Sequence, residues 1–194
     1  MAEMDLKTHA VNKDTLAEYC RIPTWYEVRS RLDVEIISDG FEGMVFREKK
    51  VDRPYKKYYG ETEEPLIWMQ FNTANWVIFF VNEGDTPVGG ITIACKTPEL
   101  RMLNGRDDLA DVWDIRVHPD FRHRGNGTRL FQKAIAWSRE NGYRQLCVET
   151  QNVNVNACRF YLKQGCKLGA VNRFAYRGYP MLAEEVQLIW FMDL

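Results

Sequence analysis

The chain has 194 residues, of which 45% are hydrophobic and 13% aromatic. This is enough apolar material for the core of one domain of ordinary size. The formal net charge is -1, so the overall charge gives no reason to expect a nucleic-acid partner. The sequence contains no apolar run of signal-peptide or membrane-span character. We therefore expect a single cytoplasmic domain over residues 1–194, with neither nucleic acid nor a membrane as its partner.

The first half of the chain predicts strands, short helices and glycine-containing turns. The pattern indicates short helices over 14–21 and 65–71, strands over 33–38 and 43–51, and a hairpin over 75–96. The hairpin arms are rich in β-branched and aromatic residues. They flank the run N-E-G-D at 82–85, which is typical turn chemistry.

The second half of the chain alternates strands with helices. After a loop over 98–108, a strand over 110–119 is stopped by Pro119, and the next strands cover 145–151 and 184–194. Helices are expected from Gly127 to Asn141-Gly142, and from a cap at Asn154 or Asn156 to Gln164, with Gly165 as the stop. This order predicts an α/β or α+β fold with a mixed sheet.

The five cysteines show no spacing that indicates a metal site or a redox pair. Three of them lie in apolar segments, where a small thiol packs well. We expect reduced core thiols and no bound metal. The residues are Cys20, Cys95, Cys147, Cys158 and Cys166.

The loop between the strand at 110–119 and the following helix has the chemistry of an anion site. A glycine-containing turn before a helix gathers unpaired N–H groups at the positive end of the helix dipole. The nucleotide-triphosphatase loop requires a Lys after its last glycine, and none follows Gly127. The dinucleotide fingerprint requires a third glycine, where this chain has Leu130.

Two spaced motifs follow one another in the second half of the chain. The first, R-x-x-G-x-G, is formed by Arg122, Gly125 and Gly127, and the second, N-x-x-A-x-x-x-Y-x-x-x-G, is formed by Asn154, Ala157, Tyr161 and Gly165. Together and in this order they resemble the GNAT superfamily of N-acetyltransferases. The run from Glu149 to Tyr161 further resembles the streptothricin acetyltransferase branch. The resemblance implies a mixed sheet of about six to seven strands, flanked by helices, with a splayed central parallel pair.

The resemblance also implies acetyl-CoA as the co-substrate. Its pantetheine arm is expected along the strand at 110–119 and its pyrophosphate in the loop that follows. For Arg122 and Arg124 the other interpretation is a solvated basic turn. The expected co-substrate contacts are Ile115, Arg116, Val117, Arg122, His123, Arg124, Gly125, Asn126, Gly127, Thr128, Asn154 and Tyr161.

Acetyl transfer to an amine requires a neutral nucleophile, a polarised thioester carbonyl and a proton for the departing thiolate. Tyr161 matches the family's general acid, although it is alternatively an ordinary core aromatic. A backbone N–H of the strand at 110–119 is the expected donor to the oxyanion.

Asp114 is the first candidate for the proton acceptor, with Asp111 second. Asp114 could instead form a salt bridge with Arg116. Asp and alkyl ammonium pKa values differ by about 6.5 units, or about 9 kcal/mol, so we expect proton transfer through water rather than directly. Glu149 could share this role, or it could be a solvated residue at a strand end.

The sequence therefore predicts an acetyl-CoA-dependent N-acetyltransferase. Its expected acceptor is a primary amine of a small cationic molecule, with streptothricin preferred, attacked directly within a ternary complex. Other acceptors are a polyamine, an aminoglycoside-like compound or a protein N-terminus. A non-catalytic acyl-CoA sensor and a structural or partner-binding domain are the remaining alternatives, and the chain is expected to be a monomer or a homodimer.

Overall fold

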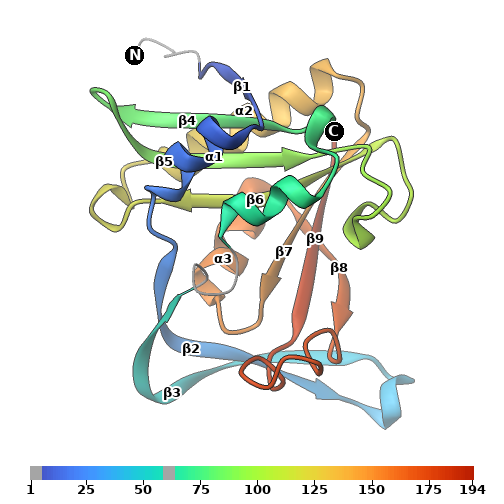
Figure 1. Ribbon diagram of the computed structural model, residues 1–194. Helices are drawn as coiled ribbons and strands as arrows, with labels where there is room; N and C mark the ends of the chain where they lie inside the picture. Colours follow the sequence, from blue (N-terminus) through green and yellow to red (C-terminus); the bar gives the residue numbers. More distant parts are fainter. Residues whose placement is uncertain (1–5, 59–63) are drawn as a thin grey trace. The chain divides into compact units, whose positions relative to one another are not determined.

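A computed structural model describes residues 6–58 and 64–194 (Figure 1). No helix in this described part of the chain is long and apolar enough to cross a membrane. The α-helices are α1 (Lys13–Cys20), α2 (Asn126–Glu140) and α3 (Val155–Gln164). The strands are β1 (Thr8–Ala10), β2 (Trp25–Ile36), β3 (Met44–Tyr58), β4 (Val77–Glu83), β5 (Thr86–Ala94), β6 (Leu109–Val117), β7 (Gln145–Gln151), β8 (Lys167–Asn172) and β9 (Gln187–Asp193).

Seven of the strands form a mixed sheet in the order β1-β4-β5-β6-β7-β9-β8, and β2 pairs with β3 separately. The hairpin β4–β5 is antiparallel, as its turn residues predicted. β6 and β7 run parallel, with Leu109 to Val112 opposite Gln145 to Val148. The expected fold class, α/β with a mixed sheet and a parallel pair, is confirmed.

The chain gathers into two compact units. The first comprises Met1–Trp25, Tyr58–Val148 and Met192–Leu194, and the second comprises Tyr26–Lys57 and Glu149–Phe191. The helices α1 and α2 belong to the first unit, and α3 belongs to the second. The expectation of one domain over 1–194 stays a prediction.

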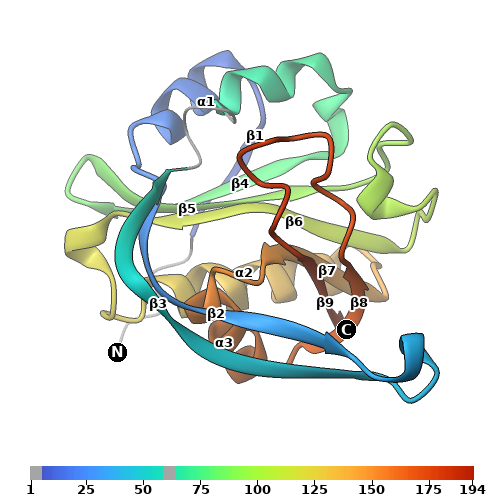
Figure 2. The ribbon, with the colours of Figure 1, turned by 90° about the horizontal axis from the view of Figure 1, so that it is seen from below.

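In the first unit, α1 and α2 cover opposite faces of the strands β4, β5 and β6 (Figure 2). Adjacent glycines of β5 allow both helices to approach, because successive strand residues point to opposite faces. A Cβ at Gly89 would lie 3.2 Å from Leu130 of α2, and one at Gly90 would lie 2.4 Å from the Tyr19 ring of α1. β5 is therefore buried along nearly its whole length.

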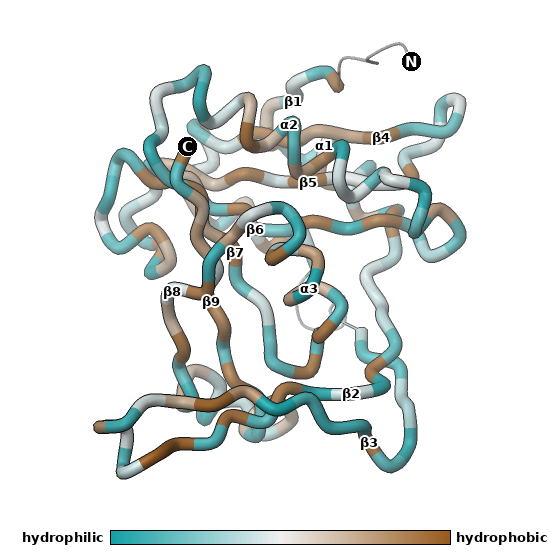
Figure 3. The backbone as a smooth tube through the Cα atoms, turned by 180° about the vertical axis from the view of Figure 1, so that it is seen from behind, coloured by the Kyte–Doolittle hydropathy of each residue, from teal (hydrophilic) through white to brown (hydrophobic). Residues whose placement is uncertain are grey.

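In the second unit, β2 and β3 form a long curved ribbon (Figure 2). β3 is mostly exposed, and many of its positions are hydrophilic (Figure 3). β8 and β9 pair antiparallel. α3 is capped at its start by Asn154, whose side chain accepts from the Ala157 N–H at 3.2 Å, and it ends at Gly165 with φ of 95°.

Most elements match the sequence-based expectations, with differences at their ends. β7 has the predicted bounds, and the segment 65–70 is a short 3-10 helix. β3 extends to Tyr58, further than predicted, and the short strands β1 and β8 were not predicted. The predicted loop at 98–108 contains a 3-10 turn at Arg101–Leu103, and β6 begins directly after it at Leu109.

All five cysteines lie in the described part of the chain and are free thiols, as expected, and four of them are buried. The core assignment was wrong for Cys20, which is exposed at the last position of α1. The pKa values of the Cys95 and Cys158 thiols are both raised to about 12, mainly by burial.

Replacing Gly90 with Ala should destabilise the protein. The added Cβ would lie 2.4 Å and 2.9 Å from two Tyr19 ring carbons, so α1 must shift. We expect the free energy of unfolding to fall by about 1–3 kcal/mol in urea denaturation. Gly178→Ala is the control, because no atom lies within 4 Å of its added Cβ, and its effect should stay within about 0.5 kcal/mol. Equal stabilities of the two variants would contradict the packing role of Gly90.

Candidate functional site

β6 carries a bulge against β5 that involves Trp113. Asp114 lies opposite Thr92, while Val112 lies opposite Ile93, so Trp113 is the extra residue of β6. A bulge interrupts the hydrogen-bond ladder and can leave backbone groups available to a ligand. The Trp113 ring is 6.4 Å from that of Trp68 and 5.4 Å from that of Trp76, centroid to centroid, so an aromatic cluster supports the bulge.

Asp114 is engaged by two side chains of the first unit. Its two carboxylate oxygens accept from Nε and Nη2 of Arg116, both at 2.8 Å. Tyr19 donates its hydroxyl to the same carboxylate at 2.6 Å. Burial, and then the Asp114 charge, raise the pKa of Tyr19 well above its ordinary value, so the phenol stays a donor. The salt bridge considered as an alternative for Asp114 is therefore present.

Asp111, the second candidate, lies deeper in the sheet. It is only 2% exposed, and its carboxylate accepts from the Cys147 thiol at 3.5 Å. Burial, followed by the Asp111 charge, raises the pKa of Cys147 far above its usual range. This thiol therefore stays protonated and serves as a donor to Asp111.

The loop after β6 turns through backbone conformations with positive φ. His123 has φ of 60° and Gly125 has φ of 84°. The Asn126 side chain donates to the Phe121 carbonyl at 3.0 Å and closes the turn. α2 then begins at Asn126, with Gly125 as its cap. The first N–H groups of a helix lack intrahelical acceptors, so this loop presents donors of the kind that bind anions.

Arg122 and Arg124 occupy different environments in this loop. Arg122 is half-buried and donates from Nε to the Val117 carbonyl at 2.9 Å and from Nη2 to the Trp25 carbonyl at 2.6 Å. Its guanidinium also lies 5.5 Å from the centre of the Trp25 ring. Arg124 is exposed, with its guanidinium 4.9 Å from the centre of the Phe121 ring. Arg122 thus fastens the loop through main-chain carbonyls, while Arg124 lies toward solvent.

The candidate residues of the second unit begin with α3. Tyr161 is only 4% exposed and packs edge-on against Phe160, with ring centroids 5.4 Å apart. Asn154 makes the helix cap, so a structural role for it is established, whatever else it contacts.

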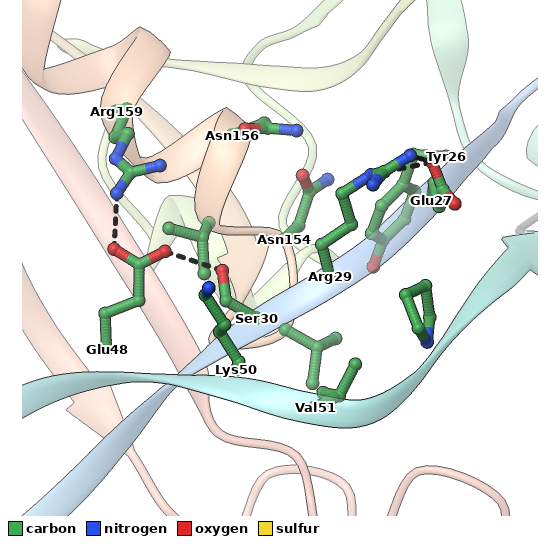
Figure 4. A pocket seen from close by; sticks show the side chains of 13 residues that line it. Tyr26, Glu27, Arg29, Ser30, Glu48, Lys50, Val51, Asn154, Asn156 and Arg159 are labelled. Carbon is green, nitrogen blue, oxygen red and sulfur yellow. Dashed lines mark hydrogen bonds and ion pairs between the residues drawn. The ribbon is translucent and has the colours of Figure 1, made fainter.

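A pocket of about 400 Å³ opens at the start of α3 in the second unit (Figure 4). Asn154 and Asn156 line it from the helix, and Lys50 lines it from β3. Most of its charges are matched within the pocket itself. Arg159 pairs with Glu48, which also accepts from Ser30 at 2.6 Å, and Arg29 pairs with Glu27 at 2.6 Å.

Glu149 lies near the end of β7 and is held by neutral donors. The Tyr176 hydroxyl donates to its Oε1, and the Gln187 amide donates to its Oε2 at 2.6 Å. Glu149 is therefore not simply a solvated residue at a strand end. Sequence reasoning assigned no role to Tyr176 or Gln187, because neither lies in the two motifs that located the other candidates.

The structure distributes the candidate residues over both units. The first unit brings together the Asp114–Arg116 pair, Asp111, the segment 115–117 and the loop 122–128. The second unit contains Glu149, Asn154 and Tyr161. Across residues 6–58 and 64–194, no group of three or more His, Cys, Asp or Glu side chains could hold a metal ion.

Comparison with known proteins shows similarity to acetyltransferases. The model of the Acetyltransferase (GNAT) family matches residues 44–166. Streptothricin acetyltransferase A of Bacillus subtilis (strain 168) is 30% identical over 146 residues, which are 75% of this chain and 78% of that protein.

Two solved structures share the fold of the chain. One is a Bacillus anthracis str. Ames protein, assigned as a streptothricin acetyltransferase and solved in complex with acetyl coenzyme A. Its TM-score to this chain is 0.73 at 24% identity, and the match covers 98% of this chain and 100% of that one. The other is nourseothricin acetyltransferase, with a TM-score of 0.75 at 21% identity, over 96% and 97% of the two chains.

Arg122→Ala should loosen the loop that precedes α2. The variant loses two hydrogen bonds from a charged donor to the carbonyls of Val117 and Trp25. We expect backbone amides of residues 122–128 to exchange with deuterium about tenfold faster, as measured by mass spectrometry. Arg124→Ala, which removes an exposed neighbour, should leave exchange unchanged. Equal protection in both variants would show that Arg122 does not fasten the loop.

Proposed function

The chain belongs to the GNAT family of acetyltransferases, and from this premise we propose that it acetylates a primary amine of streptothricin. As a family member it is an acetyl-CoA-dependent N-acetyltransferase. The observation that carries the choice of acceptor is the similarity to streptothricin acetyltransferase A over three quarters of the chain. The β-lysine amine is the proposed nucleophile, and acetylation there would confer resistance to the antibiotic.

We assign the pyrophosphate of acetyl-CoA to the loop 122–128. N–H groups at the start of α2 would bind the phosphate oxygens, and Gly125 supplies the left-handed turn that precedes them. Arg122 would act by stabilising the loop, because its guanidinium already donates to two main-chain carbonyls. Arg124 is the better source of charge for the phosphates, because its side chain is exposed.

The thioester arm is assigned to backbone groups of Ile115 and Val117 in β6. The N–H groups beside the Trp113 bulge are the proposed donors to the oxyanion. Arg116 would stabilise this part of β6 through its salt bridge with Asp114, and it would not contact the co-substrate. His123, Asn126 and Thr128 complete the proposed contacts in the loop, with Asn154 and Tyr161 contributing from α3.

The reaction requires three proton movements. The neutral amine nitrogen attacks the thioester carbonyl, the carbon–sulfur bond breaks, and Tyr161 gives its proton to the departing thiolate. The nitrogen of the adduct then loses its extra proton, which returns through water to the Tyr161 oxygen. The ammonium must first lose a proton, and we assign its acceptance, through water, to Glu149. Asp114 is assigned the weaker role of holding Arg116 beside the bulge, because Arg116 engages both of its oxygens.

Tyr161→Phe should lower turnover without weakening co-substrate binding. The substitution removes the acidic proton but keeps the buried ring, so the core around α3 should stay packed. We expect kcat to fall by about 10²–10⁴-fold, with the dissociation constant of acetyl-CoA within about twofold of the wild-type value. Steady-state kinetics measures kcat, and calorimetry measures the dissociation constant of acetyl-CoA. An undiminished kcat would show that Tyr161 is not the general acid.

Streptothricin should support release of CoA thiol from acetyl-CoA, and chelators should not change the rate. The measurement is thiol release across a panel containing streptothricin, a polyamine, an aminoglycoside and a peptide with a free N-terminus. Turnover only with another amine would replace the proposed acceptor. A raised melting temperature with acetyl-CoA but no turnover would indicate a sensor, and no thermal shift at all would contradict co-substrate binding.

A further inference from the structure

The hydrogen bonds around Glu149 assign a role to a residue outside every motif in the chain. We propose that Tyr176 is a positioning residue: its hydroxyl orients the Glu149 carboxylate to receive the proton of the acceptor amine through water. Gln187 holds the other carboxylate oxygen. This inference rests on the proposed function, and it extends the set of functional residues into the loop between β8 and β9.

Within residues 6–58 and 64–194, one side chain donates to each oxygen of Glu149. Tyr176 donates to Oε1 and Gln187 donates to Oε2. A carboxylate with one donor on each oxygen has a defined rotamer and plane. Each oxygen can accept more than one hydrogen bond, so the lone pairs left over can face a water or an ammonium group. The arrangement fixes the direction of Glu149 and leaves it able to accept a proton.

A third side chain sets the direction of the Tyr176 hydroxyl. The Gln151 amide nitrogen donates to the Tyr176 oxygen at 3.2 Å. A phenol has a single hydrogen, and an amide N–H can only donate. The hydroxyl therefore accepts from Gln151 and keeps its own hydrogen for Glu149. Gln151 thus donates to Tyr176, and Tyr176 donates to Glu149.

Tyr176 is held in place by burial and by the anchoring of its loop. As a whole residue, Tyr176 is 9% exposed. At the other end of the loop, Glu185 pairs with Lys57, and both of those side chains are about one-tenth exposed. Tyr179, between these two points, is 63% exposed. The loop is thus fixed on both sides of an exposed middle, so Tyr176 belongs to its rigid part.

A positioning role differs from a purely structural one in how its loss combines with the loss of Glu149. If Tyr176 acts only by orienting that carboxylate, removing its hydroxyl matters only while the carboxylate is present. If it acts by stabilising the loop, its effect should be the same with or without the carboxylate. Combining the two substitutions therefore separates a positioning role from a structural one. Neither substitution should change the KM for acetyl-CoA.

The test is a double-mutant cycle of Tyr176→Phe and Glu149→Gln, with streptothricin as the acceptor. We expect Tyr176→Phe alone to lower kcat about tenfold, with the KM for acetyl-CoA unchanged. In the Glu149→Gln background the same substitution should change kcat less than about twofold. Gln187→Met is the second variant and should behave like Tyr176→Phe. Tyr179→Phe is the matched control and should match the wild type.

The outcomes distinguish this inference from the function on which it rests. The positioning role is overturned if the two kcat losses multiply in the double variant, or if Tyr176→Phe keeps full kcat. In either case, turnover by the wild type leaves the proposed function standing. Full kcat in Glu149→Gln overturns the role of Glu149 and, with it, that of Tyr176. Absence of wild-type turnover on every amine of the panel overturns the proposed function itself, and this inference with it.

Discussion

The contact of Tyr19 with Gly90 determines how α1 lies on the sheet, and the strand that leads into the glycine loop depends on it. The absence of a side chain at Gly90 lets the Tyr19 ring lie directly on β5. From there the hydroxyl reaches Asp114 of β6, the residue after the bulge. One aromatic side chain thus connects a helix, a glycine of one strand and the bulge of the next. The proposed oxyanion donors and thioester contacts lie in that strand.

The two candidate carboxylates differ in the charge of their partners. Asp114 is bound by the Arg116 guanidinium through both oxygens, which is a two-point contact with a charged donor. Glu149 is bound by a phenol and an amide, which orient it without supplying a positive charge. A carboxylate held by neutral donors is better suited to accept a proton than one committed to an arginine. The environments, not the residue types, support the different roles.

In the loop before α2, backbone conformation and side-chain hydrogen bonds have different roles. Gly125 allows the left-handed turn, while His123 adopts positive φ despite its side chain. The Arg122 fork stabilises this geometry by binding the Val117 carbonyl of β6 and the Trp25 carbonyl of β2. An arginine that matches a phosphate-loop pattern therefore need not contact a phosphate. Its position in the motif is equally explained by the loop it holds.

Local patterns in the sequence determined much of the fold and the place of the glycine loop. Strand alternation, the Asn154 cap and the Gly165 stop act over a few residues, so they can be read without a structure. The two motifs also placed Arg122 and Tyr161 on the elements that carry them.

Only the tertiary structure decided what the charged and polar groups bind. Tyr19 and Asp114 are 95 residues apart in the chain, and Tyr176 and Glu149 are 27 apart. No periodicity or spacing relates such pairs, because their contact depends on how strands pair and helices pack. The sequence therefore pointed to the nearby Arg116 as a partner of Asp114, but nothing in it pointed to Tyr19 or Tyr176 as partners of the carboxylates.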